Sequence, residues 1–489
     1  MKPPKTVAKR ICHGKADRVD VYPLSAGQMG MLYEVLSWPG ECMLQDQILC
    51  DIQGRIDVNC FVGAWEKVTL RHSALRSGVV VGDDGAACQV VTASALPTVI
   101  VDDFRHVCEQ DKNEMINRVL NRETSARFRL DAPPLWRVAL LLIEEDRSKV
   151  IVASHHIMLD GWSFGIVIRE VCAIYQALQS GRGTALPAPV PYRRYIDWLA
   201  RRNLQTASEF WQHALRGEMT EVKTWQLESA SPPARRTHRH VVRLSNEETT
   251  CIVHFGKDCG VTMATILQGV WALVLAALMD TAKVVYGCVY SGRSASVDGI
   301  ERLVGSTINV LPVRIHVTGN DIKQWLARIQ EDHQNRMRHE YCSLAQIKQW
   351  IAPSQLSIES VLAFMNNEVP QGIEDRELRI VKVDYTTGLA YPIAINVDPG
   401  DTLSIRVMVD RPTVSEQCAA DLAELVKIAL ASLCNRVEYT VEGVLSEVRR
   451  VNERLAEQRS LDRRLSIMDF PISPGSPACR LKAAEKRNT

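Results

Sequence analysis

Residues 134–163 read PLWRVALLLIEEDRSKVIVASHHIMLDGWS and contain the strongest structural signal of the chain. Two apolar runs flank the charged segment EEDRSK, a pattern typical of two strands joined by a turn. The second run ends in His155 and His156, and Asp160 and Gly161 follow after three further residues. The next stretch, FGIVIREVCAIYQALQ, spaces its apolar residues three or four positions apart, as a helix does. Strand, turn, strand, polar loop and helix are therefore expected in this order.

The same alternation continues in both directions. Upstream, GQMGMLYEVL and FVGAWEKVTLRHSALR have helical spacing, and GVVV follows as a strand. Downstream, helices are predicted for VTMATILQGVWALVLAALM and IKQWLARIQEDHQNRMRHEY, and strands for KVVYGCVYSG, STINVLPVRIHV and TLSIRVMVD. Alternating helices and strands in both halves predict an α/β or mixed α+β fold.

Size and charge narrow the class of protein. A chain of 489 residues is too long for one simple core and suits two lobes of about 150–250 residues. The 58 basic and 57 acidic residues give a net charge of +1, which offers nothing to attract nucleic acid or an anionic membrane. The apolar stretch 263–279 is short for a membrane span and contains Gln268, so a buried core helix is predicted. We expect a cytoplasmic protein that does not associate with membranes.

Composition along the chain suggests the domain boundaries. Gly and Pro gather between residues 180 and 191, where they would interrupt helix and strand alike. The expected segments are a flexible N-terminal extension over 1–20, an N-terminal lobe over 21–185, an interlobe linker over 186–200, a C-terminal lobe over 201–450 and a charged, partly disordered tail over 451–489. The basic N-terminal extension and the tail are candidate docking elements.

Neither a disulfide framework nor a metal site is predicted. The 14 cysteines are spread from Cys12 to Cys479 without a C-x-x-C pair, which favours reduced thiols. The side chains of adjacent residues on a strand point to opposite faces, so His155 and His156 diverge, and no third ligand follows at a useful spacing.

The two histidines nevertheless form a candidate catalytic motif with Asp160. Burying an imidazole or a carboxylate costs several kcal/mol unless each group finds a partner. One histidine can face a cavity while its neighbour packs into the lobe. A histidine in that position could take a proton from an attacking group, which is worth about 10²–10⁴ in rate. These residues alone leave catalysis and hydrogen-bonded structure equally open.

Several motifs together resemble one family. HHIMLDGWS resembles the HHxxxDG signature of the condensation domains of nonribosomal peptide synthetases. YPLSAGQMGML, RHSALR, YRRYIDWLA and VGSTINVLPVR resemble further motifs of that family in the family's order, and PLWRVALL and the SGR at Ser291–Arg293 also match in place. The likeness runs from about residue 22 to about residue 445. It implies two lobes of the chloramphenicol-acetyltransferase type, arranged as a V with an active-site tunnel between them.

The resemblance also assigns roles to individual residues. His156 corresponds to the catalytic histidine and His155 to its packed neighbour. Asp160 is implied to be structural, paired with an arginine for which Arg76 is the matching candidate. Gly161 is expected to line the tunnel.

Three further residues complete this expected site. Trp162 and Ser163 are expected to serve packing and helix N-capping rather than chemistry. Asn309 is left open between tunnel lining and strand-end structure.

The implied reaction is acyl transfer without a bound cofactor. A carrier protein presents the acyl chain on its phosphopantetheine arm, and an amine or hydroxyl acceptor, either a small molecule or carrier-bound, attacks it to form an amide or ester. Taken as a complete chain, the protein would be a monomer that meets its carrier in trans. Two alternatives stay open: a coenzyme A-dependent acyltransferase, and a non-catalytic carrier-recruitment module of the same fold.

Overall fold

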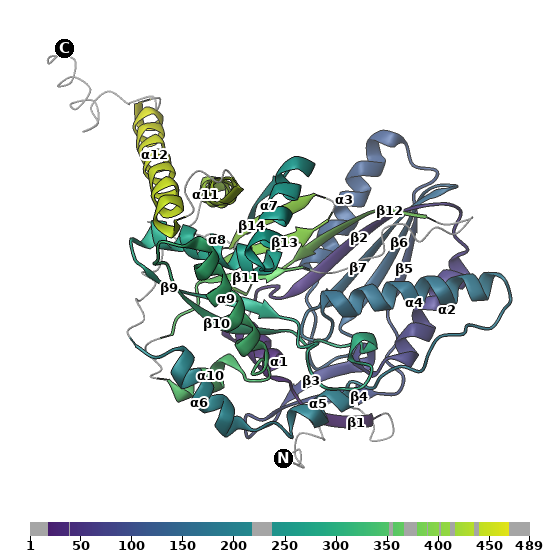
Figure 1. Cartoon of the computed structure of the whole chain (residues 1–489). Coiled ribbons are helices and arrows are strands. Elements are labelled where there is room, and N and C mark those ends of the chain that lie inside the picture. Colours follow the sequence, from purple (N-terminus) through teal and green to yellow (C-terminus); the bar gives the residue numbers. More distant parts are fainter. Residues whose placement is uncertain are drawn as a thin grey trace, which may run out of the picture.

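The computed structural model arranges the chain around two large sheets (Figure 1). It describes residues 18–38, 40–217, 237–351, 356–365, 379–388, 390–400, 402–410, 416–434 and 440–468. The N-terminal extension lies almost wholly outside these ranges. So do the last 21 residues of the expected tail, 469–489.

The first sheet has five strands in the order β12-β2-β7-β6-β5. Successive side chains on a strand point to opposite faces, so Leu140 packs with Trp65 and Phe164 in one core, whereas Leu141 packs with Ile116 in another. Helices therefore cover both faces of this sheet. The elements are β2 Gln45–Gln53, α2 Val58–Arg71, β5 Val99–Asp103, α3 Glu109–Ser125, β6 Trp136–Glu144, β7 Arg147–His155, α4 Gly161–Gln179 and β12 Arg379–Thr387.

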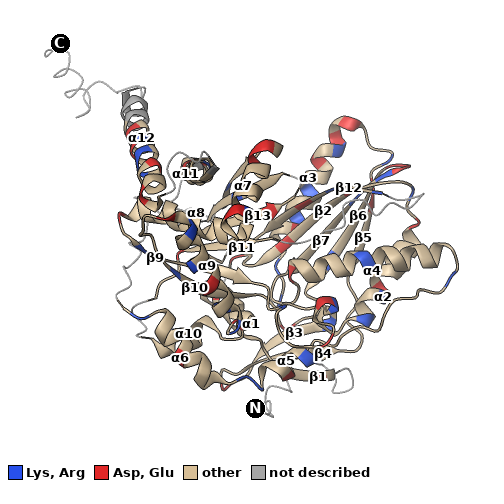
Figure 2. Ribbon diagram, viewed as in Figure 1, with Lys and Arg blue, Asp and Glu red and all other residues tan. Residues whose placement is uncertain are grey.

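The second sheet has six strands in the order β10-β9-β11-β13-β14-β8. Its helix α8 has no charged residue (Figure 2). Thirteen consecutive residues of this helix are buried, as the sequence predicted. The elements are β8 Thr237–Arg243, α7 Asn246–Cys259, α8 Met263–Met279, β9 Lys283–Tyr290, β10 Asn309–His316, α9 Ile322–Met337, β11 Ser360–Phe364, β13 Ile393–Pro399, β14 Leu403–Asp410, α11 Glu416–Cys434 and α12 Val441–Met468.

A smaller sheet and several short helices connect these two layers. The small sheet has the order β1-β4-β3. The elements are β1 Arg18–Pro23, α1 Ala26–Ser37, β3 Ser77–Val81, β4 Ala87–Thr92, α5 Arg193–Leu199, α6 Leu204–Ala214, α10 Leu344–Trp350 and the 3₁₀ turns Ser73–Arg76 and Ile300–Arg302. The expected linker 186–200 thus contains a helix, and its Tyr192 and Tyr195 are buried beside Tyr22.

The two halves of the sequence are interlocked by β12. This strand comes from the second half of the chain, yet it pairs antiparallel with β2 in the first sheet (Figure 1). The register sets Thr387 opposite Asp46, next to the end of β7 that carries the histidines. A boundary drawn along the sequence therefore does not separate the two sheets.

No single helix in the described ranges is long and apolar enough to cross a membrane. Helices α7 and α8 together would be long and apolar enough, but the chain bends by 100° between them.

Candidate active site

His155 is the last residue of β7 and is only 2% exposed. Its Nδ1 accepts a hydrogen bond from the backbone N–H of Ile157 at 3.2 Å, and its ring packs edge-on against Phe128. Burial lowers the pKa of His155 to about 4, so the ring is neutral at pH 7. This is the packed position that the resemblance gave to the first histidine.

His156 faces the other way and is held by an acid from β2. Its Nδ1 lies 2.5 Å from Oδ2 of Asp46, and Asp46 Oδ1 accepts a hydrogen bond from the Thr387 hydroxyl on β12 at 2.5 Å. A carboxylate can only accept, so Nδ1 donates and Nε2 is the nitrogen left to accept a proton. Nε2 has no hydrogen-bond partner among the described residues, and 15% of the side chain is exposed.

The surroundings make His156 a stronger base than an ordinary imidazole. Burial lowers the pKa of His156, but the charge and hydrogen bond of Asp46, with a contribution from Asp160, more than offset this. The net effect is a pKa above the usual 6.5. Tyr385 stays neutral beside Asp46, because burial first and that negative charge second raise the pKa of Tyr385 well above 10.

Asp46 was missed in the sequence, although the pattern contained a signal. In β2 the buried positions alternate, and Asp46 shares the buried face with Ile48 and Cys50 at 3% exposure. An acid on the apolar face of a strand needs a partner. That partner could not be named from the sequence, because Thr387 lies 341 residues away.

Asp160 is the N-cap of α4 and joins both halves of the chain. Its Oδ1 accepts a hydrogen bond from Ser163 N at 2.8 Å, its Oδ2 accepts one from Thr307 N at 2.9 Å, and the Arg293 guanidinium lies at 3.1 Å. Burial raises the pKa of Asp160, but Arg293 and these donors outweigh burial, so the pKa is lower than usual. Asp160 is therefore an ionised structural anchor.

The expected pairing of Asp160 with Arg76 was wrong. Arg76 ends a 3₁₀ turn, where its guanidinium donates to the carbonyls of Thr69 and Thr92. The partner is Arg293 of the SGR segment, and its side chain is 8% exposed. The order of the motifs along the sequence did not indicate Arg293 as the partner, because Arg293 lies in a loop of the second half of the chain that only the fold brings to Asp160.

Ser163 and Trp162 attach the loop between β9 and β10, which carries Arg293, to the start of α4. Ser163 is not the N-cap, a role that Asp160 fills; its hydroxyl instead donates to the carbonyl of Gly305 at 2.9 Å and accepts from Gly305 N at 3.0 Å. The indole N–H of Trp162 donates to the carbonyl of Glu301 at 2.9 Å, while the residue stays 37% exposed. Trp162 thus covers a surface loop rather than filling a core.

Gly161 and Asn309 have different surroundings. Gly161 is the half-buried first residue of α4, and its expected place in the lining of a tunnel stays a prediction. Asn309, 6% exposed, donates both amide hydrogens to backbone carbonyls, those of Glu340 at 2.8 Å and Cys342 at 2.6 Å. These bonds give Asn309 the contacts of a strand-end structural residue.

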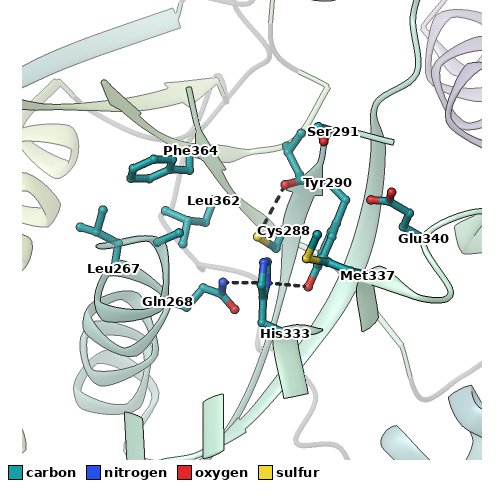
Figure 3. Close-up of a pocket in the computed structure, with 12 residues that line it drawn as sticks. Leu267, Gln268, Cys288, Tyr290, Ser291, His333, Met337, Glu340, Leu362 and Phe364 are labelled. Atoms are coloured by element: carbon teal, nitrogen blue, oxygen red, sulfur yellow. Dashed lines mark hydrogen bonds between the residues drawn. The ribbon is translucent and has the colours of Figure 1, made fainter. Parts of the chain in front are cut away.

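Within the described ranges, no group of three or more His, Cys, Asp or Glu side chains is arranged to hold a metal ion. A cavity of about 210 Å³ opens in the second half of the chain, between α8, α9, β9 and β11 (Figure 3). His156 does not line it.

Residues 18–435 match the condensation domain family model. The chain belongs to the condensation domain family. It is 28% identical over 461 residues to a linear gramicidin synthase of Brevibacillus parabrevis, and the match covers 92% of this chain and 6% of that relative. It is 32% identical over 370 residues to chondramide synthase cmdD of Chondromyces crocatus, and this match covers 74% and 9%. The chain thus spans less than a tenth of either relative.

Solved condensation domains share the fold. The first condensation domain of the calcium-dependent antibiotic synthetase, in complex with substrate analogue 2a, has a TM-score of 0.71 at 17% identity, with 87% of this chain and 99% of that chain covered. The condensation domain of the monacolin K polyketide synthase MokA has a TM-score of 0.72 at 15% identity, with 87% and 100% covered. The predicted chloramphenicol-acetyltransferase-like fold is therefore confirmed.

Proposed function

We propose that this condensation domain transfers an acyl chain from a carrier-protein phosphopantetheine thioester to an amine or hydroxyl acceptor, with His156 as the base. The observation that carries the proposal is the geometry of His156: Asp46 engages Nδ1, and the basic Nε2 remains without a partner in the described chain. Family membership supports condensation as the type of reaction.

The proposed reaction balances with one proton moved. The nucleophile attacks the thioester carbonyl, the bond from carbon to the new nitrogen or oxygen forms, and the carbon–sulfur bond breaks. Nε2 of His156 accepts the proton of the nucleophile and returns it to the departing thiolate, giving the product and the free carrier thiol. The activated thioester requires neither ATP nor metal, and holding the two substrates together supplies about 7–11 kcal/mol of the barrier.

Replacing Asp46 by asparagine should shift the pH dependence of the reaction. The base must be neutral, so wild-type kcat/KM should rise with pH through a midpoint above 6.5. Asp46→Asn removes the charge that raises the pKa but leaves the burial that lowers it, so the midpoint should move below the wild-type value. A rate profile between pH 5 and pH 9 measures the shift.

Thr387→Val is the matched control for that profile. It removes the hydrogen bond to Asp46 but keeps the carboxylate, so the midpoint should move much less than in Asp46→Asn, and Thr387→Ser should restore it. Equal midpoints in wild type and Asp46→Asn would show that Asp46 does not tune the base.

Intact-protein mass spectrometry tests the proposed function directly. An acyl-loaded carrier protein from the same gene cluster is incubated with candidate amines and alcohols, with and without the enzyme. The expected result is loss of the acyl mass from the carrier together with an amide or ester product. A stable complex in which the carrier keeps its acyl group would favour a non-catalytic recruitment module. Turnover with acyl-coenzyme A but not with the acyl-carrier would favour a coenzyme A-dependent acyltransferase.

A further inference from the structure

The cavity between α8, α9, β9 and β11 has a mostly apolar lining, with polar residues on one side. Leu267, Leu362, Phe364 and Met337 contribute the apolar surface. At about 210 Å³ the cavity is far larger than the roughly 15 Å³ that one ordered water requires. The proposed proton transfer at His156 uses none of these residues.

A chain of hydrogen bonds on the polar side fixes the tautomer of His333. Arginine only donates, so Arg336 Nε gives its hydrogen to the hydroxyl oxygen of Tyr290 at 2.9 Å. The same hydroxyl lies 3.1 Å from Nδ1 of His333 and can donate or accept there. Gln268 turns its Oε1 towards Arg336 at 3.5 Å and its Nε2 towards the same Nδ1 at 3.1 Å. Nδ1 of His333 is therefore the acceptor.

The other ring nitrogen of His333 must then carry the hydrogen. Burial first, and the nearby charge of Arg336 second, lower the pKa of His333 to about 4, so the ring is neutral at pH 7. Nε2–H has no hydrogen-bond partner among the described residues, and Figure 3 shows the ring rising into the middle of the lining residues. The cavity thus contains one pre-oriented donor.

The cavity also adjoins the loop that anchors Asp160. Ser291 lines the cavity, and its carbonyl accepts from the Thr307 hydroxyl at 2.7 Å. The same hydroxyl lies 3.2 Å from Asp160 Oδ2. Neither lysine nor arginine is among the described residues that line the cavity, so the lining offers an anionic ligand no direct partner and leaves a neutral oxygen as the group for Nε2–H to bind.

We propose that this cavity is a substrate subsite for a neutral, mainly apolar chain with a hydrogen-bond-accepting oxygen, which His333 binds through Nε2–H. This inference rests on the proposed acyl transfer and adds the kind of chain that one of its two substrates carries. Both the acyl donor and the acceptor could bring such a chain.

Matched pairs of ligands test the subsite by binding alone. The donor pair is the N-acetylcysteamine thioesters of heptanoate and 5-methoxypentanoate, and the acceptor pair is hexylamine and 4-methoxybutylamine. Within each pair one methylene is replaced by an ether oxygen. Calorimetric titration gives the Kd ratio of each pair for wild type, for His333→Phe, and for His254→Phe as a control at an exposed histidine of α7.

His333→Phe should weaken binding of the ether relative to the alkyl chain by about 5-fold, because one hydrogen bond is lost. His254→Phe should leave the ratio unchanged. A second variant, Ala264→Phe, fills the cavity and should weaken both members of the responding pair. A shift in the thioester pair assigns the subsite to the donor, and a shift in the amine pair assigns it to the acceptor.

Unchanged ratios in both pairs, or wild-type affinity in Ala264→Phe, would overturn the subsite. Undetectable binding of all four ligands to wild type would do the same. Because the binding measurement needs no turnover, it is independent of the proposed function. If the protein binds the ligands as expected but transfers no acyl group, the proposed function is contradicted and the subsite is not.

Discussion

Replacing His156 by alanine should lower the rate of acyl transfer by about 10²–10⁴-fold, the usual contribution of a general base. The reason is geometric: Asp46 holds Nδ1 at 2.5 Å, which leaves Nε2 as the basic nitrogen of the ring. The measurement is single-turnover loss of acyl mass from a saturating acyl-carrier.

His156→Asn provides the matched variant, because alanine leaves the buried Asp46 carboxylate without its donor, whereas the amide nitrogen of asparagine, bonded to Cγ as Nδ1 is, can still donate to Asp46. The amide cannot accept a proton near neutral pH. We expect this variant to fold like wild type and to be about as slow as His156→Ala. Rates within a few-fold of wild type in both variants would show that positioning of the substrates, rather than proton transfer, carries the reaction.

Local patterns in the sequence predicted part of the secondary structure. The strand pair β6 and β7 and the helices α4 and α8 lie where the apolar spacing placed them. Their periodicity depends only on neighbours within a few residues, so one sequence contains it. The placement of β12 beside β2 depends on pairing between segments that are far apart in the sequence, and local apolar spacing does not predict such pairing.

The residues of the candidate site likewise fall into two groups, those that are close in the sequence and those that only the fold brings together. The motif singled out His155, His156 and Asp160 together, because a few residues of strand and turn join them. Their partners Asp46 and Arg293 come from other elements. Asp46 was missed in the sequence and Arg76 was expected in place of Arg293, because only the folded chain shows which side chains contact His156 and Asp160.

Breaking the Asp160–Arg293 pair should have the largest effect on stability. Both side chains are nearly buried, at 2% and 8% exposure. Arg293→Met would leave the buried carboxylate without its charged partner, which costs about 3–5 kcal/mol. Urea unfolding measures the loss, and a change below about 1 kcal/mol would show that the remaining donors to Asp160 suffice.

The pH dependence of unfolding gives this prediction a direction. Because the pKa of Asp160 is lowered in the folded state, its contribution is present above the usual 3.8 and is lost as the pH falls through the folded value. Asp160→Asn should therefore lose less stability on acidification than wild type does. An unchanged acid dependence would mean that other carboxylates dominate it.

Double variants decide which arginine is the partner. Asp160→Asn combined with Arg293→Met should deviate from additivity by about 0.5–3 kcal/mol, since the two residues are in contact. Asp160→Asn combined with Arg76→Ala should be additive within about 0.5 kcal/mol, because Arg76 donates to the carbonyls of Thr69 and Thr92 instead. Coupling to Arg293 would also show that this charge pair attaches the loop that carries Arg293 to the start of α4.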